Sequence, residues 1–312
     1  MSEKDIVNEN DTSIRISNTD SRLVMTKIML SANEHNISVL ADCKGEILRE
    51  VGGYFARVEM KSKGLQMVVF NFLDPDFSDQ WDILDECFDP EFKIIDVEKT
   101  REFVNDILSL FDDKFDDDFS NLLLFSILLS YYHHKYELTN ENAYNFEISD
   151  IIDVLKDYKE HKNEFIRIAS VFELENLSYK IFYKDDVTKS DSIEEQVNKF
   201  VSYFTENRLS LFSSKGISCS EVSTKQATYF VIYDEFDGFS NGLTLLFLKY
   251  VWRNAVRQRS ESMKGAIPLK FFACENIGVK NKKNLEDFAA LVRNSKGKNL
   301  QIWEIGESTT RR

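Results

Sequence analysis

The sequence has few of the residues that mark disulfide-rich, zinc-binding or membrane-spanning proteins. Its four cysteines, Cys43, Cys87, Cys219 and Cys274, show no C-x-x-C spacing, which predicts reduced intracellular thiols and argues against a zinc site. The most apolar run, Leu122 to Leu129, is far shorter than the roughly 20 residues that cross a bilayer. The N-terminus also lacks the basic-then-apolar pattern of a signal peptide. We therefore expect a cytoplasmic protein that does not insert into membranes.

Basic residues are scarce relative to acidic ones. The chain has 39 Lys and Arg against 53 Asp and Glu, a net charge of -14. Because phosphate groups are bound mainly by Lys and Arg, this balance opposes direct binding to nucleic acid or anionic lipid. It favours protein partners, basic ones in particular. The 25 Phe and 12 Tyr provide bulky side chains for sizeable cores.

The 312 residues contain only three prolines and 11 glycines, so few positions interrupt regular structure. Residues 1–12 are polar and acidic, and we expect them to be disordered. Residues 13–97 alternate short apolar strands with helix-length segments, which predicts an α/β lobe with a mostly parallel sheet. The predicted strands are Ile14–Ile16, Ile37–Ala41, Gln66–Phe72 and Phe92–Val97.

Residues 98–212 show the period of helices instead. Leu122 to Tyr132 is apolar nearly all round, so we expect it to be the central buried helix of an all-α insertion domain. From 213 to 312 the strand signal returns in three apolar runs separated by helices, which predicts that the α/β lobe resumes. The runs are Tyr229–Tyr233, Leu269–Ala273 and Leu300–Ile305.

Four stretches, in the same order, resemble motifs of one family. Residues 38–46 read as an apolar strand followed by Asp42-Cys-Lys44-Gly45-Glu46, which is similar to the D-P-K-G-E motif of the TraG-type coupling ATPases of conjugation and type IV secretion. Residues 66–84, 224–238 and 268–278 resemble three further family stretches. The resemblance implies a RecA-like P-loop NTPase lobe interrupted by an all-α insertion that takes part in substrate recognition.

The same resemblance places a phosphate loop about twenty residues before Asp42, at residues 18–23. Thr19 and Ser21 stand where the family has glycines, which a loop needs because its backbone N–H groups turn inward at positive φ. Arg22 replaces the lysine that neutralises the β and γ phosphate oxygens, and Leu23 replaces the hydroxyl that binds magnesium. The loop therefore lacks its main nucleotide contacts.

The other motif positions of this vestigial nucleotide site are also altered. By the family register, Cys274 and Glu275 stand at the acidic motif, and Glu307 follows Arg293 where the family has an uncharged sensor. Each lost charged hydrogen bond costs roughly 1.5 to 3 kcal/mol, so ATP and magnesium should bind weakly at best. We expect a pseudo-ATPase with no cofactor and no metal.

Several interpretations stay open at this point. The turn that contains Asp42 and Lys44 has two equally good interpretations. It is either a scaffold at the nucleotide side of the sheet or a simple strand-to-helix turn. Asp234 and Glu235 after an apolar strand offer an alternative acidic motif, which would resemble the channel-energising ATPases of the same superfamily; the plainer interpretation is a solvated turn.

We expect three polar clusters to have structural roles. We expect the acidic cluster at residues 112–118 to be a solvated helix N-terminus, and His133-His134 to cap a helix C-terminus. The arginines Arg253, Arg257 and Arg259 are expected on a solvent-exposed helix face.

The resemblance, together with the altered motif positions, implies a catalytically inactive adaptor or recruitment factor in conjugative DNA transfer or type IV secretion. Its partners would be proteins of that apparatus, with a full-length coupling protein among the candidates, and these partners could recruit it to the inner membrane. The alternatives are a nucleotide-binding ATPase subunit whose missing groups come from a neighbouring chain, and an interfering subunit that blocks coupling-protein rings.

Overall fold

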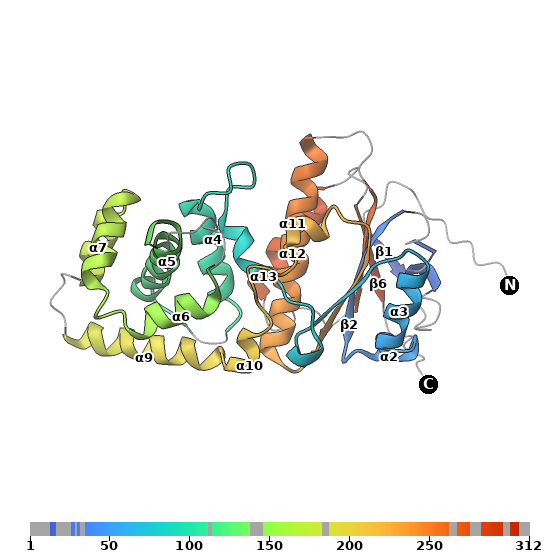
Figure 1. Cartoon of the computed structure of the whole chain (residues 1–312), viewed down its shortest axis with the longest axis horizontal. Helices are drawn as coiled ribbons and strands as arrows, with labels where there is room; N and C mark the ends of the chain where they lie inside the picture. Colours follow the sequence, from blue (N-terminus) through green and yellow to red (C-terminus); the bar gives the residue numbers. More distant parts are fainter. Residues whose placement is uncertain are drawn as a thin grey trace. The chain divides into compact units, whose positions relative to one another are not determined.

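The computed structural model describes residues 13–16, 26–28, 30–31, 35–111, 114–137, 146–182, 187–261, 267–274, 282–295 and 300–305. The chain forms two compact units (Figure 1). Residues 1–79 and 217–312 make up the first, which we call the α/β unit, and residues 80–216 make up the second, the helical unit. The predicted disordered segment, residues 1–12, lies outside the described residues.

The α/β unit contains one sheet, in which six parallel strands are found within the described residues. They are β1 (Ser13–Ile16), β2 (Ile37–Cys43), β3 (Met67–Asn71), β4 (Thr228–Tyr233), β5 (Leu269–Cys274) and β6 (Leu300–Ile305). Their order is β1-β6-β5-β2-β4-β3, and every neighbouring pair is parallel. The predicted α/β class with a parallel sheet is confirmed.

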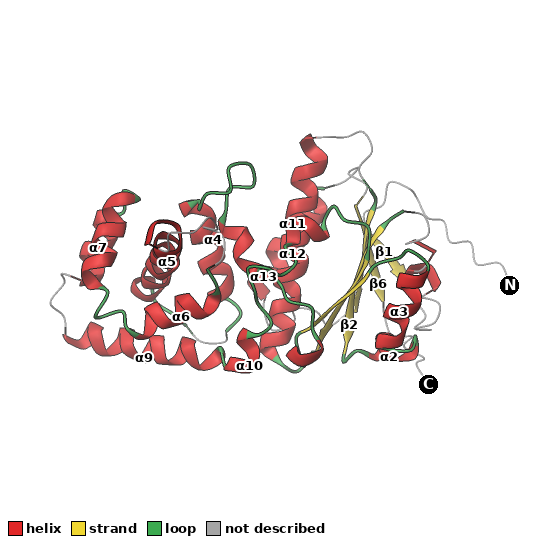
Figure 2. Ribbon diagram, viewed as in Figure 1, coloured by secondary structure: helices red, strands yellow, loops and turns green. Residues whose placement is uncertain are grey.

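Helices cover both faces of this sheet (Figure 2). The face with α2 (Glu46–Glu50) and α3 (Tyr54–Ser62) buries Leu40, Val69 and Phe230. The opposite face carries α12 (Gly238–Glu261) and α13 (Lys282–Arg293), and Phe247 of α12 contacts Phe70 at a ring distance of 4.8 Å. Consecutive strand residues point to opposite faces, which is why the fully apolar strands serve both layers.

The direction of each connection explains which face its helix covers. The connection from β2 to β3 runs toward the β3 edge and passes through α2 and α3, whereas those from β4 to β5 and from β5 to β6 run back through α12 and α13. Because crossovers between parallel strands are right-handed, connections in opposite directions must lie on opposite faces. The strand order therefore fixes the two helical layers.

The segment after β3 covers the outer edge of that strand. The Val69 N–H donates to Oδ2 of Asp79 (2.9 Å), and the Asn71 N–H donates to Oγ of Ser78 (2.9 Å). Arg57 holds the Asp79 carboxylate from α3, at 2.9 Å. Side chains thus satisfy N–H groups that would otherwise offer an edge for aggregation.

The helical unit is built around α5 (Asp117–Tyr132), whose residues Leu122 to Leu129 are at most 2% exposed, so the predicted central buried helix is confirmed. The Phe119 N–H donates to Asp116 at 2.8 Å, which confirms the helix N-terminus for residues 116–118; Asp112 and Asp113 lie outside the described residues. The other helices are α4 (Val97–Leu108), η3 (His133–Glu137), α6 (Ile148–Lys156), α7 (Lys162–Val171), α8 (Glu175–Phe182), α9 (Val187–Tyr203) and α10 (Glu206–Leu209), with a 3-10 turn, η2 (Ile83–Cys87).

The division between the units falls at other residues than the predicted 97/98 and 212/213. Residues 80–97 belong to the helical unit because their apolar side chains pack inside it: Phe88 lies 5.8 Å from Tyr131 and 6.0 Å from Phe146, ring to ring. The strand predicted at Phe92–Val97 is wrong. Only one isolated bridge, Phe88 to Ile95, forms there before α4 begins at Val97.

One predicted solvent-exposed arginine is buried instead. Arg259 on α12 is 4% exposed, and its guanidinium donates to the carbonyls of Ala255 (3.2 Å) and Ile267 (2.5 Å). Burial lowers its pKa to about 10. The prediction failed because the carbonyl of Ile267, just before β5, lies within hydrogen-bond distance of this side chain on the last turn of α12. Among the described helices, none is both long and apolar enough to cross a bilayer.

Candidate functional site

The carboxyl ends of the six parallel strands lie along one edge of the sheet, and several predicted site residues follow those ends. Asp42 lies in β2, Lys44 follows it, Asp234 follows β4, and Cys274 ends β5. In open α/β sheets, ligands bind at this edge where neighbouring strands lead to helices on opposite faces. β2 leads to α2 and its neighbour β4 leads to α12 on the other face. The β2–β4 crevice is therefore the candidate site.

Asp42 is engaged by the backbone of the α/β unit itself. Its side chain is 1% exposed and accepts from the N–H of Ile47 at 3.1 Å and the N–H of Leu48 at 2.8 Å. Burial raises its pKa to about 6, although the two N–H groups act in the opposite direction. Asp42 thus ties the end of β2 to the start of α2.

Lys44 and Gly45 form the turn between β2 and α2. The Lys44 N–H donates to the carbonyl of Tyr233 at 2.7 Å, so the turn is anchored to β4. Lys44 has φ 57° and Gly45 has φ 66°. This backbone region is left-handed and favours glycine, and a lysine found there is uncommon. The geometry is that of a strand-to-helix turn.

The Lys44 ammonium lies over the crevice beside an acidic turn. It is 3.9 Å from Oδ1 of Asp234 and 5.1 Å from the ring centroid of Phe236, which is 71% exposed. The same Asp234 oxygen accepts from the Phe236 N–H at 2.9 Å. Asp237 accepts from the N–H of Ser240 at 2.9 Å within the first turn of α12. The Asp234 carboxylate therefore serves the turn that precedes α12.

Cys43, the residue between Asp42 and Lys44, is half-buried at the same edge. Burial raises the pKa of its thiol, and a backbone hydrogen bond with Glu235 opposes this effect only partly. Because nucleophilic and metal-binding cysteines act as thiolates, this environment disfavours such chemistry.

The strand order separates this crevice from the end of β1, after which the phosphate loop was predicted. β2 lies three strands from β1 and β4 lies four strands from it. At about 4.8 Å per strand these separations are roughly 14 Å and 19 Å. A phosphate held after β1 would therefore be too far for direct contact with Lys44 or Asp234, whereas β6 and β5 are the first and second neighbours of β1.

The structure brings Asp42, Lys44, Asp234 and Glu235 to one crevice but not the remaining predicted residues. Cys274 ends β5 beside Ile305 of β6. Arg293 is the last residue of α13, which leads into the start of β6, so it lies toward the opposite edge of the sheet. The rest, Thr19, Ser21, Arg22, Leu23, Glu275 and Glu307, are outside the described residues and stay predictions.

Two features of the crevice were missed by sequence reasoning. Phe236 is an exposed aromatic side chain whose position over Lys44 depends on the pairing of β2 with β4, which the chain order does not reveal. Cys43 was considered only for disulfide or zinc chemistry. Across the part of the chain that the structure describes, no group of three or more His, Cys, Asp or Glu is arranged to hold a metal ion.

The sequence matches no protein-family model and no curated protein sequence. Solved structures are similar. An unbound form of the bacterial conjugative coupling protein TrwBdeltaN70 matches with a TM-score of 0.52 and 12% identity, over 95% of this chain and 61% of that one. The plasmid coupling protein TrwB in complex with the non-hydrolysable GTP analogue GDPNP matches with a TM-score of 0.52 and 13% identity, over 95% of this chain and 63% of that one.

These matches confirm the expected fold. The fold of this chain is similar to that of the TrwB coupling proteins over 95% of its length. It spans about three fifths of the length of those chains. At 12 to 13% identity the similarity establishes the fold but not the activity.

Proposed function

We propose that this chain works in a conjugative transfer or type IV secretion apparatus as a catalytically inactive, protein-binding adaptor. One combined observation carries the proposal. The chain has the coupling-protein fold over 95% of its length, yet residues 18–23, which follow β1, contain neither glycine nor lysine. A fold that holds a GTP analogue in TrwB is thus combined with a loop that lacks the groups for gripping a triphosphate.

The described geometry at the sheet edge supports this proposal. The Asp42 carboxylate accepts from the N–H groups of Ile47 and Leu48 in the first turn of α2, so these two groups are not available to an outside anion. The Lys44 ammonium lies beside the Asp234 carboxylate, three strands from β1. Phosphoryl transfer depends almost wholly on placed positive charge and metal, so these groups do not replace those missing from the loop.

The adaptor would bind proteins of the apparatus, among them a full-length coupling protein, chiefly through the helical unit. Its location would be the cytoplasm, with recruitment to the inner membrane by those partners. The second candidate is an ATPase subunit completed by a neighbouring chain. The GTP analogue bound to TrwB, a protein of the same fold, favours that candidate.

Nucleotide binding and hydrolysis decide between the two candidates. Saturating ATP and magnesium at 100 times a dissociation constant would stabilise the folded chain by about 2.7 kcal/mol. We expect no rise in the unfolding temperature with 5 mM ATP-magnesium and no turnover above that of the heated protein. A rise that disappears in Arg22→Gln but persists in Lys44→Gln, or turnover abolished by Glu275→Gln, would contradict the adaptor proposal.

The protein-binding half of the proposal needs a separate measurement. The chain is co-expressed with a tagged full-length coupling protein, and the two are purified through that tag. We expect co-purification at a fixed ratio without inhibition of the partner's ATPase activity. Loss of that activity in proportion to bound chain would point to an interfering subunit instead.

A further inference from the structure

The negative charge of this protein resides in one of its two units. Residues 80–216 contain 30 Asp and Glu but only 15 Lys and Arg, a net charge of -15. The rest of the chain contains 23 acidic and 24 basic residues, a net charge of +1. The helical unit is therefore the part that attracts positively charged partners and repels nucleic acid.

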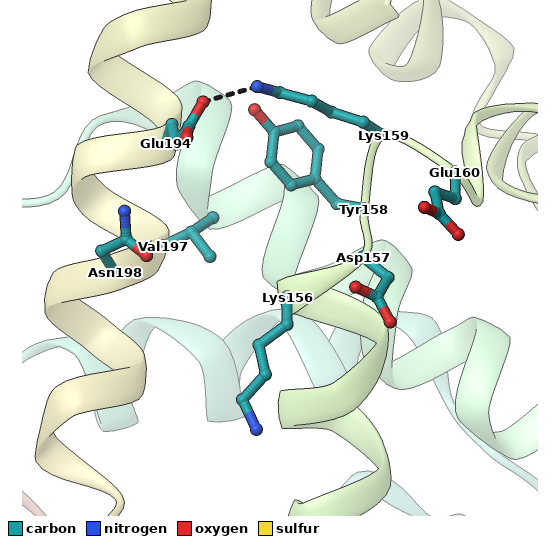
Figure 3. A pocket seen from close by; sticks show the side chains of 8 residues that line it. All are labelled: Lys156, Asp157, Tyr158, Lys159, Glu160, Glu194, Val197 and Asn198. Carbon is teal, nitrogen blue, oxygen red and sulfur yellow. Dashed lines mark hydrogen bonds and ion pairs between the residues drawn. The ribbon is translucent and has the colours of Figure 1, made fainter.

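A pocket of about 250 Å³ opens in this unit between the α6–α7 connection and α9 (Figure 3). Its lining consists of Lys156, Asp157, Tyr158, Lys159, Glu160, Glu194, Val197 and Asn198. The volume is below the range of roughly 300 to 1,000 Å³ that is typical of sites for cofactors and drug-sized ligands. It suits a single long side chain better than a nucleotide.

Two elements supply the walls of the pocket. Glu194, Val197 and Asn198 lie three and four residues apart on α9 and therefore share one face of that helix. The C-terminal end of α6 and the connection that follows it supply the rest, including Tyr158, which is only 7% exposed. The pocket thus has a buried aromatic wall and a carboxylate opposite.

A cation already occupies part of this arrangement. The Lys159 ammonium donates to Glu194 across the pocket, as the dashed line in Figure 3 shows, and lies 5.7 Å from the ring centroid of Tyr158. Carboxylate and aromatic face together are the groups that bind an ammonium or guanidinium. Both Lys159 and Glu194 are more than half exposed, so an incoming cation can exchange with Lys159.

Two further carboxylates of the lining are available to an incoming cation. Within the described residues, the side chains of Asp157 and Glu160 have no hydrogen-bond or ion-pair partner. Lys156, the other lysine of the lining, is paired with Asp153 at 3.1 Å. With three acidic and two basic residues, the lining has a net charge of -1 inside a unit of -15.

We infer that this pocket receives a lysine or arginine side chain from a basic segment of a protein partner, with displacement of Lys159 from Glu194. The inference rests on the proposed adaptor function and assigns its recognition site. Tyr158 provides the face for the cation, Glu194 provides the paired charge, and the surrounding acidic unit draws the basic segment in.

The test uses the full chain and a fluorescein-labelled octapeptide of four lysine–glycine repeats, with binding followed by fluorescence anisotropy at 150 mM salt. The matched variants are Glu194→Gln and Glu195→Gln. They lie side by side on α9 and remove the same charge, but adjacent helix residues point about 100° apart, and only Glu194 lines the pocket. We expect a rise in Kd of about fivefold for the first and less than twofold for the second.

The displacement of Lys159 from Glu194 is tested by a second pair of variants. Lys159→Gln should lower the Kd several-fold, because the incoming cation no longer competes for Glu194. Lys215→Gln, which removes the same charge from an exposed site outside the pocket, should lower it less than twofold. Amide shifts of the bound peptide complex should centre on residues 156–160 and 194–198.

Equal effects of Glu194→Gln and Glu195→Gln, no binding of the lysine peptide, or equal binding of a four-repeat glutamate–glycine peptide would each overturn the pocket assignment. So would amide shifts confined to other helices. Tighter binding of a single-stranded oligonucleotide than of the lysine peptide would do the same. None of these outcomes would affect co-purification with a coupling protein, so the adaptor function is tested separately from the pocket.

Discussion

Replacement of Asp42 by Asn should remove a pH dependence of stability that arises because folding raises the pKa of this carboxyl group. Burial raises the pKa of Asp42 from 3.8 to about 6. A carboxyl whose pKa is raised by folding holds its proton more tightly in the folded state, so its contribution to stability falls as pH rises from 3.8 to 6. At 1.36 kcal/mol per unit, the whole change is roughly 3 kcal/mol.

The difference in unfolding free energy between wild type and Asp42→Asn isolates this contribution, because the other titrating groups contribute equally to both proteins. The free energy of unfolding of wild type relative to the variant should fall by about 2 kcal/mol between pH 4.5 and pH 7. Glu59→Gln is a control of opposite sign in the same unit. The Lys63 ammonium lowers the pKa of Glu59, so wild type should gain stability over that variant as pH rises through the acid range.

Urea unfolding, followed by tryptophan fluorescence in a Trp81→Phe background, reads the α/β unit through Trp252 and Trp303. A difference that stays flat or rises with pH would refute the reasoning, since it would mean that the N–H groups of Ile47 and Leu48 outweigh burial. At pH 4.5 Asp42→Ala should destabilise the unit by about 2 to 4 kcal/mol because both N–H groups lose their acceptor, and at pH 7 by less, since wild type then bears the cost of a buried charge.

The remaining predictions concern turns, edges and the helical unit. Gly45→Ala should cost about 1 to 2 kcal/mol of unfolding free energy and more than Gly64→Ala, because both have positive φ but only Gly45 has a side chain within 3.4 Å of the new Cβ. Asp82→Asn should stabilise the helical unit by up to roughly 4 kcal/mol at pH 7 and less at pH 5 in urea unfolding, since burial raises the Asp82 pKa to about 8. Asp79→Ala should lower the aggregation temperature in light scattering, because the Val69 N–H at the sheet edge loses its acceptor.

Much of the fold followed from the sequence because its signal is local. Strands buried on both faces read as short apolar runs, and β2, β4, β5 and β6 lie where those runs predicted them. The helix apolar on all sides is the centre of the helical unit. The run Phe92–Val97 misled the prediction because apolar composition does not reveal burial: Phe92 is 66% exposed.

The candidate site followed from the sequence only in part. The Asp42 to Gly45 turn was visible, because glycine and its neighbours fix the local backbone. The contacts of Lys44 with Asp234 and Phe236 join groups that lie far apart in the chain and meet only because β2 pairs with β4. No spacing in the chain encodes those meetings.

The sequence alone determined the composition of each unit: the apolar runs, the helical period, the absence of glycine and lysine at residues 18–23, and the acidic excess between 80 and 216. These properties reside in consecutive residues. The tertiary structure decided the strand order, which sets β2 and β4 side by side and three or four strands from β1, and it joined Tyr158 to Glu194 in one pocket. Those juxtapositions connect residues far apart in the chain, and packing of the two cores selects them.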